Sequence, residues 1–317
     1  MFKNLSLLSV ILGLLSCSSP NSEWHYSSQA HFEVSCGKLL SIDSLNSAFI
    51  SKRNVEIWLP PDFNENLKYP VLYMHDGQML FDSLSTWNHQ EWGVDEVLCS
   101  LFESHTIPPC IVVGIWNSGS NRQSEYFPQK VFESYSSDMQ DSLYQFTNKT
   151  YGQKYLPTKV NSDNYLKFLV QELKPLIDRH LPTLTDSENT YILGSSMGGL
   201  ISWYAGLEYP EVFGKIGCLS THWVGIIPID NNPIPSTFVS YMAQNIPEAN
   251  NSKWYFDYGT ETLDSNYQKH QLRIDSILLA KSYTFKNWMS YKAEGAKHTE
   301  RAWNARLFIP LSYLMTE

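Results

Sequence analysis

The feature that most constrains the fold is the stretch YILGSSMGGLI at residues 191–201. A short apolar run ends there in a Gly-x-Ser-x-Gly pattern, and a second apolar run with helical spacing begins at once. This order predicts a strand, a sharp turn and a helix, with Ser196 exposed at the turn. Gly194 and Gly198 keep the crowded flanks of such a turn free of side chains, and the helix N-terminus would direct N–H groups at the site. Ser196 is therefore a candidate nucleophile; the alternative is a glycine-rich turn without chemistry.

Apolar runs of strand length alternate with helical patterns along the rest of the chain. This alternation predicts an α/β domain with a mostly parallel central sheet and helices on both faces. Ligands of such sheets bind beyond the carboxyl ends of the strands, where Ser196 would lie. The polar segment 129–159 shows no clear period, and we expect it to form an excursion over the site. Strands are expected at 55–59, 69–74, 109–116, 190–193, 215–219, 253–258 and 286–291, and helices at 93–102, 164–180, from the serine turn to 209, and at 237–245, 265–279 and 300–314.

Residues 1–17 have the pattern of a bacterial lipoprotein signal peptide. A basic residue precedes a short apolar run, which ends in Leu-Leu-Ser-Cys and is too short to span a membrane. We expect Cys17 to carry a lipid anchor, 18–30 to be a polar tether and 31–317 to be the folded domain. The alternative is an ordinary signal peptide cut nearby. Both predict an exported protein, and the first predicts a periplasmic or outer-membrane lipoprotein held to the membrane by its anchor only.

Composition narrows the classes of partner. The formal net charge of -9 argues against nucleic acid, because phosphate binding needs clustered Lys and Arg. No spacing resembles a metal site, and no cofactor is expected. The mature chain would keep four cysteines, which allow three disulfide pairings that the sequence does not distinguish. The nearest two are Cys99 and Cys110, Cys36 is the third, and Cys218 lies in an expected buried strand, where a free thiol is favoured.

A serine nucleophile needs a histidine base, and three histidines follow Ser196. His298 lies after the expected strand 286–291, among small residues and just before the last helix. In hydrolases built on such sheets the base follows the nucleophile and the acid in chain order, on a loop after a strand. His298 is therefore the candidate base. His222 follows the strand 215–219 and is expected to line the pocket, while His270 lies within an expected helix.

The acid and the oxyanion hole are expected on two further loops. The acid orients the imidazole and offsets its charge, and it should follow the strand 253–258. Asp264 is favoured there; Glu261 is the alternative, since Asp264 could instead cap the next helix. The oxyanion hole needs two N–H groups. We assign them to Met197, directly after the nucleophile, and to Gln78, in the sharp turn after the strand 69–74.

Four segments together resemble the bacterial putative esterase family of α/β-hydrolases. They are RNVEIWLPP at 53–61, YMHDGQ at 73–78, GSSMGG at 194–199 and GAKHTERAW at 295–303. The family includes esterase D, feruloyl and acetylxylan esterases, enterochelin-type siderophore esterases and mycolyltransferases, and the resemblance spans roughly residues 45–315. It implies an α/β-hydrolase fold and a metal-free serine hydrolase. The triad it implies is Ser196, His298 and Asp264 or Glu261, with the amides of Gln78 and Met197 as the oxyanion hole.

Substrate contacts are expected from residues that follow strands on the same side of the sheet. Trp116 and Trp223 suit a flat sugar ring or a phenolic acyl group, with packing in the core or rim as the alternative. Arg122 would meet the substrate or pair with Glu125, and His222 would line the pocket. The leading hypothesis is an exported esterase acting on acylated carbohydrate, with acetyl or feruloyl esters as small-molecule or oligosaccharide substrates. The alternatives are a siderophore esterase, an acyltransferase and a catalytically inactive glycan-binding lipoprotein.

Overall fold

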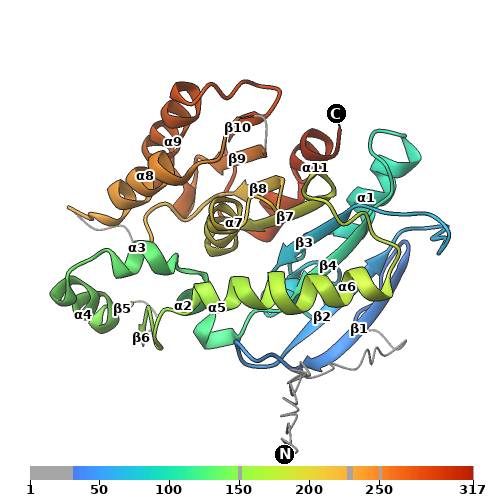
Figure 1. Cartoon of the computed structure of the whole chain (residues 1–317), viewed down its shortest axis with the longest axis horizontal. Helices are drawn as coiled ribbons and strands as arrows, with labels where there is room; N and C mark the ends of the chain where they lie inside the picture. The colour runs from blue at the N-terminus through green and yellow to red at the C-terminus, as the bar shows by residue number, and fades with distance from the viewer. Residues whose placement is uncertain (1–30, 149–151, 227–230, 250–251, 317) are drawn as a thin grey trace, which may run out of the picture.

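A computed structural model describes residues 31–148, 152–226, 231–249 and 252–316. The expected signal peptide, Cys17 and the tether lie outside the described residues. Eight strands form one sheet in the order β1-β2-β4-β3-β7-β8-β9-β10 (Figure 1). Their bounds are Lys38–Leu45, Arg53–Leu59, Ile111–Ile115, Val71–His75, Thr190–Ser195, Lys215–Leu219, Lys253–Gly259 and Trp288–Ala293, in that spatial order.

The sheet is parallel from β4 to β10, and only β1 and β2 at one edge run antiparallel to their neighbours. This confirms the expected mostly parallel α/β architecture. Every expected strand is present within two or three residues. β1 was not expected, because its sequence KLLSIDSL has polar residues that interrupt the alternation of apolar side chains.

Helices cover both faces, because successive strand residues point to opposite sides. Val71 and Tyr73 of β3 pack in one core, and Leu72 and Met74 pack in the other. The first core includes side chains of α5 (Ser162–Lys167), α6 (Lys174–His180), α7 (Met197–Glu208), α8 (Ile234–Asn245) and α9 (Gln268–Ala280). The second includes side chains of α1 (Val94–Glu103), α10 (Glu300–Asn304) and α11 (Phe308–Met315).

Three of the expected helices differ in detail. The helix expected at 164–180 is interrupted by a π-helical segment at Phe168–Leu173. A 3₁₀ turn at Thr262–Asn266 precedes α9, so that Asp264 lies in the turn and not in the helix. The closing helix is divided into α10 and α11. These breaks are local changes of hydrogen-bond spacing that a 3.6-residue period does not report.

The segment expected as an excursion contains short elements rather than irregular chain. They are α2 (Arg122–Tyr126), α3 (Gln129–Glu133), α4 (Ser137–Gln145) and the small hairpin β5–β6 at Thr147–Asn148 and Gln153–Lys154. In Figure 1 α3, α4 and the hairpin gather to one side of the sheet, away from β1. The hydroxyl of Tyr155 lies 3.4 Å from the sulfur of Met197, so the excursion reaches the serine turn.

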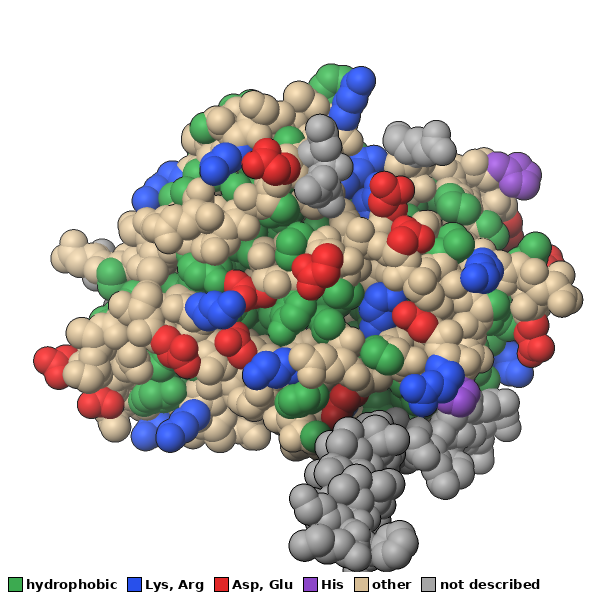
Figure 2. Space-filling view, viewed as in Figure 1, with side chains coloured by type: hydrophobic (Ala, Val, Ile, Leu, Met, Phe, Trp, Pro, Cys, Tyr) green, Lys and Arg blue, Asp and Glu red, His purple; other side chains and the backbone are tan. Residues whose placement is uncertain are grey.

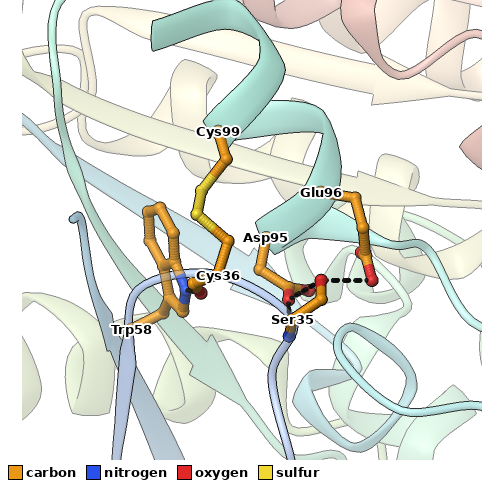
Figure 3. The surroundings of a disulfide bond; sticks show 6 residues. All are labelled: Ser35, Cys36, Trp58, Asp95, Glu96 and Cys99. Carbon is orange, nitrogen blue, oxygen red and sulfur yellow. Dashed lines mark hydrogen bonds between the residues drawn. A yellow bond between two sulfur atoms is a disulfide. The ribbon is translucent and has the colours of Figure 1, made fainter. Parts of the chain in front are cut away.

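A disulfide joins Cys36, before β1, to Cys99 in α1 (Figure 3). It connects the first described segment to the helix on the second face of the sheet. The carbonyl of Cys36 also accepts a 2.8 Å hydrogen bond from the indole of Trp58. The two other cysteines of the described chain, Cys110 and Cys218, are buried and free, as expected for Cys218. Proximity in sequence therefore did not indicate the pairing, because Cys99 bonds across 63 positions and not to its nearer neighbour.

On the face shown in Figure 2, Lys and Arg side chains are interspersed with Asp and Glu. Among the described residues, no helix combines the length and the apolar character needed to cross a bilayer.

Candidate active site

Ser196 lies at the turn between β7 and α7. Its backbone has φ 56° and ψ -120°, a strained region for a residue with a side chain. The turn is tight, because a Cβ placed on Gly194 would lie 2.7 Å from the backbone of Gly198. The amide of Ser196 donates to the Leu219 carbonyl at 3.0 Å, which ties the turn to β8. The sequence expectation of a strand, a turn and a helix is met here.

The first amides of α7 face this turn. The first helical hydrogen bond runs from Leu200 N to the carbonyl of Ser196 at 3.0 Å. The amides of Met197 and the two glycines after it therefore have no acceptor within the helix. Together with the dipole of α7 they favour negative charge beside Ser196. The side chain of Met197 is buried.

His298 and Asp264 form a close pair. Nδ1 of His298 lies 2.5 Å from Oδ1 of Asp264, and their side chains are 15% and 0% exposed. Burial alone would raise the pKa of Asp264, but its hydrogen bonds with His298, Ser220 and Gly259 and the charge of the imidazole together lower it. Glu261, the alternative acid, is exposed. The structure therefore brings Asp264, and not Glu261, to the imidazole.

The second carboxylate oxygen of Asp264 is also fully engaged. It accepts from the hydroxyl of Ser220 at 2.5 Å and from the amide of Gly259 at 2.6 Å. Ser220 in turn accepts from the indole of Trp303 and from Arg306, both at 2.9 Å. Arg306 is held by a bidentate pair with buried Asp257, its Nε and Nη2 each lying 2.9 Å from a carboxylate oxygen. The carboxylate that faces His298 thus has a fixed orientation.

Tyr267 lies among the groups of this site. Burial strongly raises the pKa of the Tyr267 hydroxyl, and the neighbouring Ser196 side chain opposes part of that rise. Its ring lies edge-on to the imidazole of His298, with centroids 5.9 Å apart. The same hydroxyl lies 2.7 Å from Nδ1 of His222. Ser196, His298 and His222 therefore surround one buried phenol.

His222 lies beside the serine, where it was expected to line the pocket. Its amide donates to the carbonyl of Ser196 at 3.1 Å, and its ring stacks on Tyr155 of the excursion, with centroids 6.3 Å apart. Burial and the neighbouring charge of His298 lower the pKa of His222 to about 3. The ring is therefore neutral at physiological pH, and it is a hydrogen-bonding group and not a fixed charge.

The turn that carries Gln78 follows β3 directly. Asp76 has φ 59°, and the 3₁₀ turn Gly77–Met79 begins after it. A Cβ on Gly77 would lie 2.5 Å from the backbone of Gly114, so only glycine fits this approach. The turn is held from one side by Asn117, whose amide N–H donates to Oε1 of Gln78 at 3.2 Å. This is the sharp turn that the sequence indicated.

Arg122 holds the same turn from the other side. Its Nε and Nη2 donate to the two oxygens of Asp76 at 2.6 and 2.7 Å. Burial would raise the pKa of Asp76, but the Arg122 guanidinium and Asn117 lower it overall. A Cβ on Gly198 would meet Oδ2 of Asp76 at 3.2 Å and Nη2 of Arg122 at 4.0 Å. The ion pair therefore lies against the start of α7, next to the serine turn.

One expectation about this loop, the pairing of Arg122 with Glu125, needs correction. Arg122 does not pair with Glu125, because Asp76 occupies its guanidinium. Glu125 instead pairs with Arg53 of β2, whose Nη2 lies 3.0 Å from Oε1 of Glu125. Both side chains are buried, so this pair joins α2 to β2, the strand next to the edge of the sheet. Arg122 and Glu125 are three residues apart in sequence, but tertiary contacts give each of them a different partner.

The two tryptophans expected to contact substrate lie in other surroundings. Trp223 is only 1% exposed, donates to Oε1 of Gln271 at 2.9 Å and packs edge-on against Trp203. It belongs to the first core and not to the surface of the site. Trp116 is partly buried; it stacks on Phe32 and donates to Glu56 at 3.1 Å. Its ring packs on the first described segment and carries no contact with the serine turn among those the structure describes.

Sequence reasoning missed Tyr155, Tyr267, Ser220 and Arg306. A tyrosine or serine at an apolar boundary carries no pattern of its own, and these four come from distant parts of the chain. Tyr267 had one available signal: it follows the candidate acid by three residues, on the loop where the acid was sought. Within the described ranges, no cluster of three His, Cys, Asp or Glu side chains could hold a metal ion.

One family model and several known proteins match this chain. The model of a family described as putative esterase matches residues 47–312. An uncharacterized Bacillus subtilis protein, YbbA, is 28% identical over 182 residues, which cover 57% of this chain and 61% of YbbA. The match thus spans less than two thirds of that relative.

Two groups of solved structures share the fold. A ferulic acid esterase from Anaeromyces mucronatus, solved with ferulic acid, superposes with a TM-score of 0.57 at 17% identity, covering 91% of this chain and 95% of its own. The enterobactin esterase of Shigella flexneri superposes with a TM-score of 0.61 at 19% identity, covering 88% and 59%. At these identities the likeness describes the fold alone.

Proposed function

Because the chain belongs to the putative esterase family, we propose that it is an exported serine esterase that hydrolyses carboxylic esters of acylated carbohydrates. The observation that carries this proposal is the contact between Nδ1 of His298 and Oδ1 of Asp264 at 2.5 Å, in a site that also holds the strained Ser196. A serine on a sharp turn, a histidine and a buried acid are the parts that acyl transfer needs. Here each comes from a separate loop after a parallel strand.

The reaction would proceed through an acyl-enzyme. His298 accepts the proton of Ser196 through Nε2 while the serine oxygen attacks the ester carbonyl carbon. Asp264 accepts a hydrogen bond from Nδ1–H, which selects the tautomer with Nε2 free and stabilises the imidazolium. His298 then protonates the leaving alcohol. Water attacks the acyl-serine in the same way and releases the carboxylic acid, which regenerates the free hydroxyl.

The negative oxygen of the tetrahedral intermediate would be held by the amides of Met197 and Gln78. The amide of Met197 is the first of α7. The amide of Gln78 lies in the 3₁₀ turn after β3. Asp76, Arg122 and Asn117 give this turn a single conformation before substrate arrives, which is what electrostatic stabilisation of a transition state requires. Loss of one such donor in comparable enzymes costs about 3 kcal/mol of transition-state stabilisation.

An acylated carbohydrate fits this site better than a siderophore trilactone. An anionic catecholate substrate calls for free cationic groups beside the nucleophile. Arg122, the cation beside the start of α7, is neutralised by its bidentate pair with Asp76. Neutral His222 and the phenols of Tyr155 and Tyr267 instead offer hydrogen bonds and aromatic faces without charge. These groups suit an acetyl or feruloyl ester of a sugar.

Export is supported by the disulfide between Cys36 and Cys99, since such bonds persist in oxidising compartments. The proposed location is the periplasm or outer membrane of a bacterium, with Cys17 as the lipid anchor. The remaining alternatives are an acyltransferase, in which a sugar alcohol replaces the water, and an inactive glycan-binding lipoprotein.

Pre-steady-state hydrolysis of p-nitrophenyl acetate tests the enzyme. We expect a burst of one nitrophenol per chain followed by turnover, and loss of both in Ser196→Ala. Ser195→Ala is the matched control, because its hydroxyl lies in β7 and not at the turn. An inactive binding protein would give neither burst nor turnover. Screening acetylated xylan, feruloyl esters and a catecholate trilactone then separates the substrate classes, and added sugar alcohols reveal an acyltransferase by forming new esters.

A further inference from the structure

Trp87 is the most exposed tryptophan of the described chain at 83% of its surface. It lies on the loop 82–91, which follows the turn carrying Gln78. A single exposed apolar side chain is common on a protein surface, so the meaning of this indole depends on the polar groups of the same loop. The indole is not part of either core, and no contact used by the proposed reaction involves it.

The loop that carries Trp87 is fixed to the last part of the chain. Nδ2 of Asn88 donates to Glu300 at 2.8 Å, and Oε1 of Gln90 accepts from the amide of Arg301 at 3.3 Å. Asn304 donates to the carbonyl of Trp92 at 2.6 Å. Three hydrogen bonds thus hold both the middle and the end of the loop against α10. The exposed indole is presented by a restrained segment, which lowers the entropy lost when it binds a ligand.

The same loop and α10 border a small polar cavity of about 210 Å³ that is open to solvent. One carboxylate oxygen of Glu91 is buried there and has no hydrogen-bond partner in the described chain. Burial and the nearby acidic groups Glu96 and Asp95 raise the pKa of Glu91. An unpaired buried acceptor is costly unless a ligand or water supplies a donor. The lining is rich in donors and acceptors: Ser83, His89, Gln90, Glu91, Arg301 and Asn304.

The cavity lies one layer of side chains from the catalytic histidine. Arg301, in its wall, follows His298 by three residues. Trp92 stacks on Trp303 with centroids 5.5 Å apart, and Trp303 meets the imidazole of His298 edge-on at 5.0 Å. Two stacked indoles therefore connect the start of α1 beside this loop to the imidazole of His298.

From this arrangement we propose that Trp87 and the polar cavity form a saccharide subsite that holds the carbohydrate part of the ester. A pyranose ring presents one apolar C–H face and a rim of hydroxyl groups. An exposed indole matches the face, and a cavity of carboxylate, amide and guanidinium groups matches the rim. The role in hydrolysis rests on the proposed esterase function, whereas binding of a sugar without an ester does not depend on it.

Two other occupants fit the observations less well. A lipid surface would favour several apolar side chains flanked by Lys and Arg, but the loop 82–91 contains Asp82 and Glu91 and no basic residue other than His89. A second copy of the chain would cover a broad apolar area, whereas this loop exposes only two large apolar side chains, Leu84 and Trp87, among polar neighbours. A sugar uses both the single aromatic ring and the polar cavity beside it.

Titration calorimetry with unesterified oligosaccharides tests the subsite directly. The probes are xylohexaose, cellohexaose and mannohexaose, with the Ser196→Ala protein used alongside the wild type. We expect at least one to bind to both proteins, and Trp87→Ala to weaken that binding by tenfold or more. Leu84→Ala is the matched control, since Leu84 is an equally exposed apolar residue of the same loop (86%). It should bind as the wild type does.

The kinetic arm compares two esters. Trp87→Ala should lower the ratio of kcat/KM for an acetylated xylo-oligosaccharide to that for p-nitrophenyl acetate by about tenfold, and Leu84→Ala should leave the ratio unchanged. Failure of the esterase function would abolish both rates but leave oligosaccharide binding. The subsite is overturned if none of the three sugars binds, if Trp87→Ala binds as well as the wild type, or if Trp87→Ala instead weakens binding to anionic vesicles or a self-association seen by sedimentation.

Discussion

The hydroxyl of Ser220 lies 2.5 Å from Oδ2 of Asp264, the carboxylate oxygen that His298 does not contact. The indole of Trp303 and Nη2 of Arg306 both donate to the same hydroxyl oxygen. Two donors occupy the lone pairs of Ser220, so its own proton must be donated to Asp264. Ser220, which follows β8, thus connects the proposed catalytic acid Asp264 to the buried Arg306–Asp257 pair by hydrogen bonds.

Replacing Ser220 should impair the function of Asp264 while leaving its carboxylate in place. In Ser220→Ala the carboxylate of Asp264 loses a charge-assisted hydrogen bond, worth about 1.5–3 kcal/mol. We expect kcat/KM to fall by about 10- to 100-fold. Because this bond helps to lower the pKa of Asp264, the acid limb of the pH profile should move to higher pH. Exposed Ser265→Ala is the control, and an unchanged acid limb would contradict a positioning role for Ser220.

The choice of acid can be tested with a pair of amide variants. Asp264→Asn should reduce kcat by about 10⁴-fold, because an asparagine at this position favours the wrong imidazole tautomer. Glu261→Gln should change kcat by less than about twofold, since this side chain is exposed and surface substitutions usually have small effects. The measurement is steady-state hydrolysis of p-nitrophenyl acetate. Equal losses in both variants would mean that the His298–Asp264 contact is structural.

The turn that carries Gln78 should depend on the pair between Arg122 and Asp76. Arg122→Met keeps much of the side-chain volume but leaves the Asp76 carboxylate without its bidentate partner. We expect kcat to fall by about tenfold or more with a smaller change in KM, because a displaced oxyanion donor acts on the transition state. The matched variant Arg179→Met removes a cation far from the site. A rise in KM alone would indicate instead that Arg122 contacts the substrate.

The carboxylates at the start of α1 should make stability depend on pH. The hydroxyl of Ser35 lies 2.9 Å from Asp95 and 2.7 Å from Glu96, and one hydroxyl proton serves only one of them (Figure 3). Burial and the charge of Glu96 raise the pKa of Asp95 to about 6. The folded state therefore holds a proton that the unfolded state releases near pH 4, and stability from this group falls as pH rises from about 4 to about 6.

Urea unfolding measured across this range tests the effect. Glu96→Gln removes the repelling charge, and we expect it to flatten the decline of unfolding free energy between pH 4 and pH 6. Glu103→Gln, at the other end of α1, is the matched control and should keep the wild-type slope. A Glu96→Gln slope equal to that of the wild type would mean that Asp95 ionises near its ordinary pKa.

The sequence predicted the parts of this protein that depend on local pattern. The strand–turn–helix around Ser196, the histidine before α10 and the glycine turn after β3 each have a signature within about ten residues, and each was found. The parallel sheet followed from the alternation of strand and helix lengths. Edge strand β1 was missed, because a strand with interrupted alternation needs its neighbour β2 to be recognised.

The remaining features depend on which side chains meet across the fold. Trp223 follows a strand on the active-site side, as a substrate contact would, yet it packs into the core against Trp203. One of the two expectations for Arg122 was a pair with its near neighbour Glu125, but Asp76, 46 positions away, occupies its guanidinium. Distances of this kind are set by tertiary packing, and neither periodicity nor spacing encodes them.

Mass spectrometry of a covalent adduct tests the central claim most directly. The protein is treated with a fluorophosphonate, digested, and the peptide spanning 191–201 is sequenced to separate Ser195 from Ser196. We predict one adduct per chain, on Ser196, with loss of esterase activity in proportion to labelling and no labelling in Ser196→Ala. An adduct on another residue, or full activity in a chain labelled at Ser196, would contradict the account.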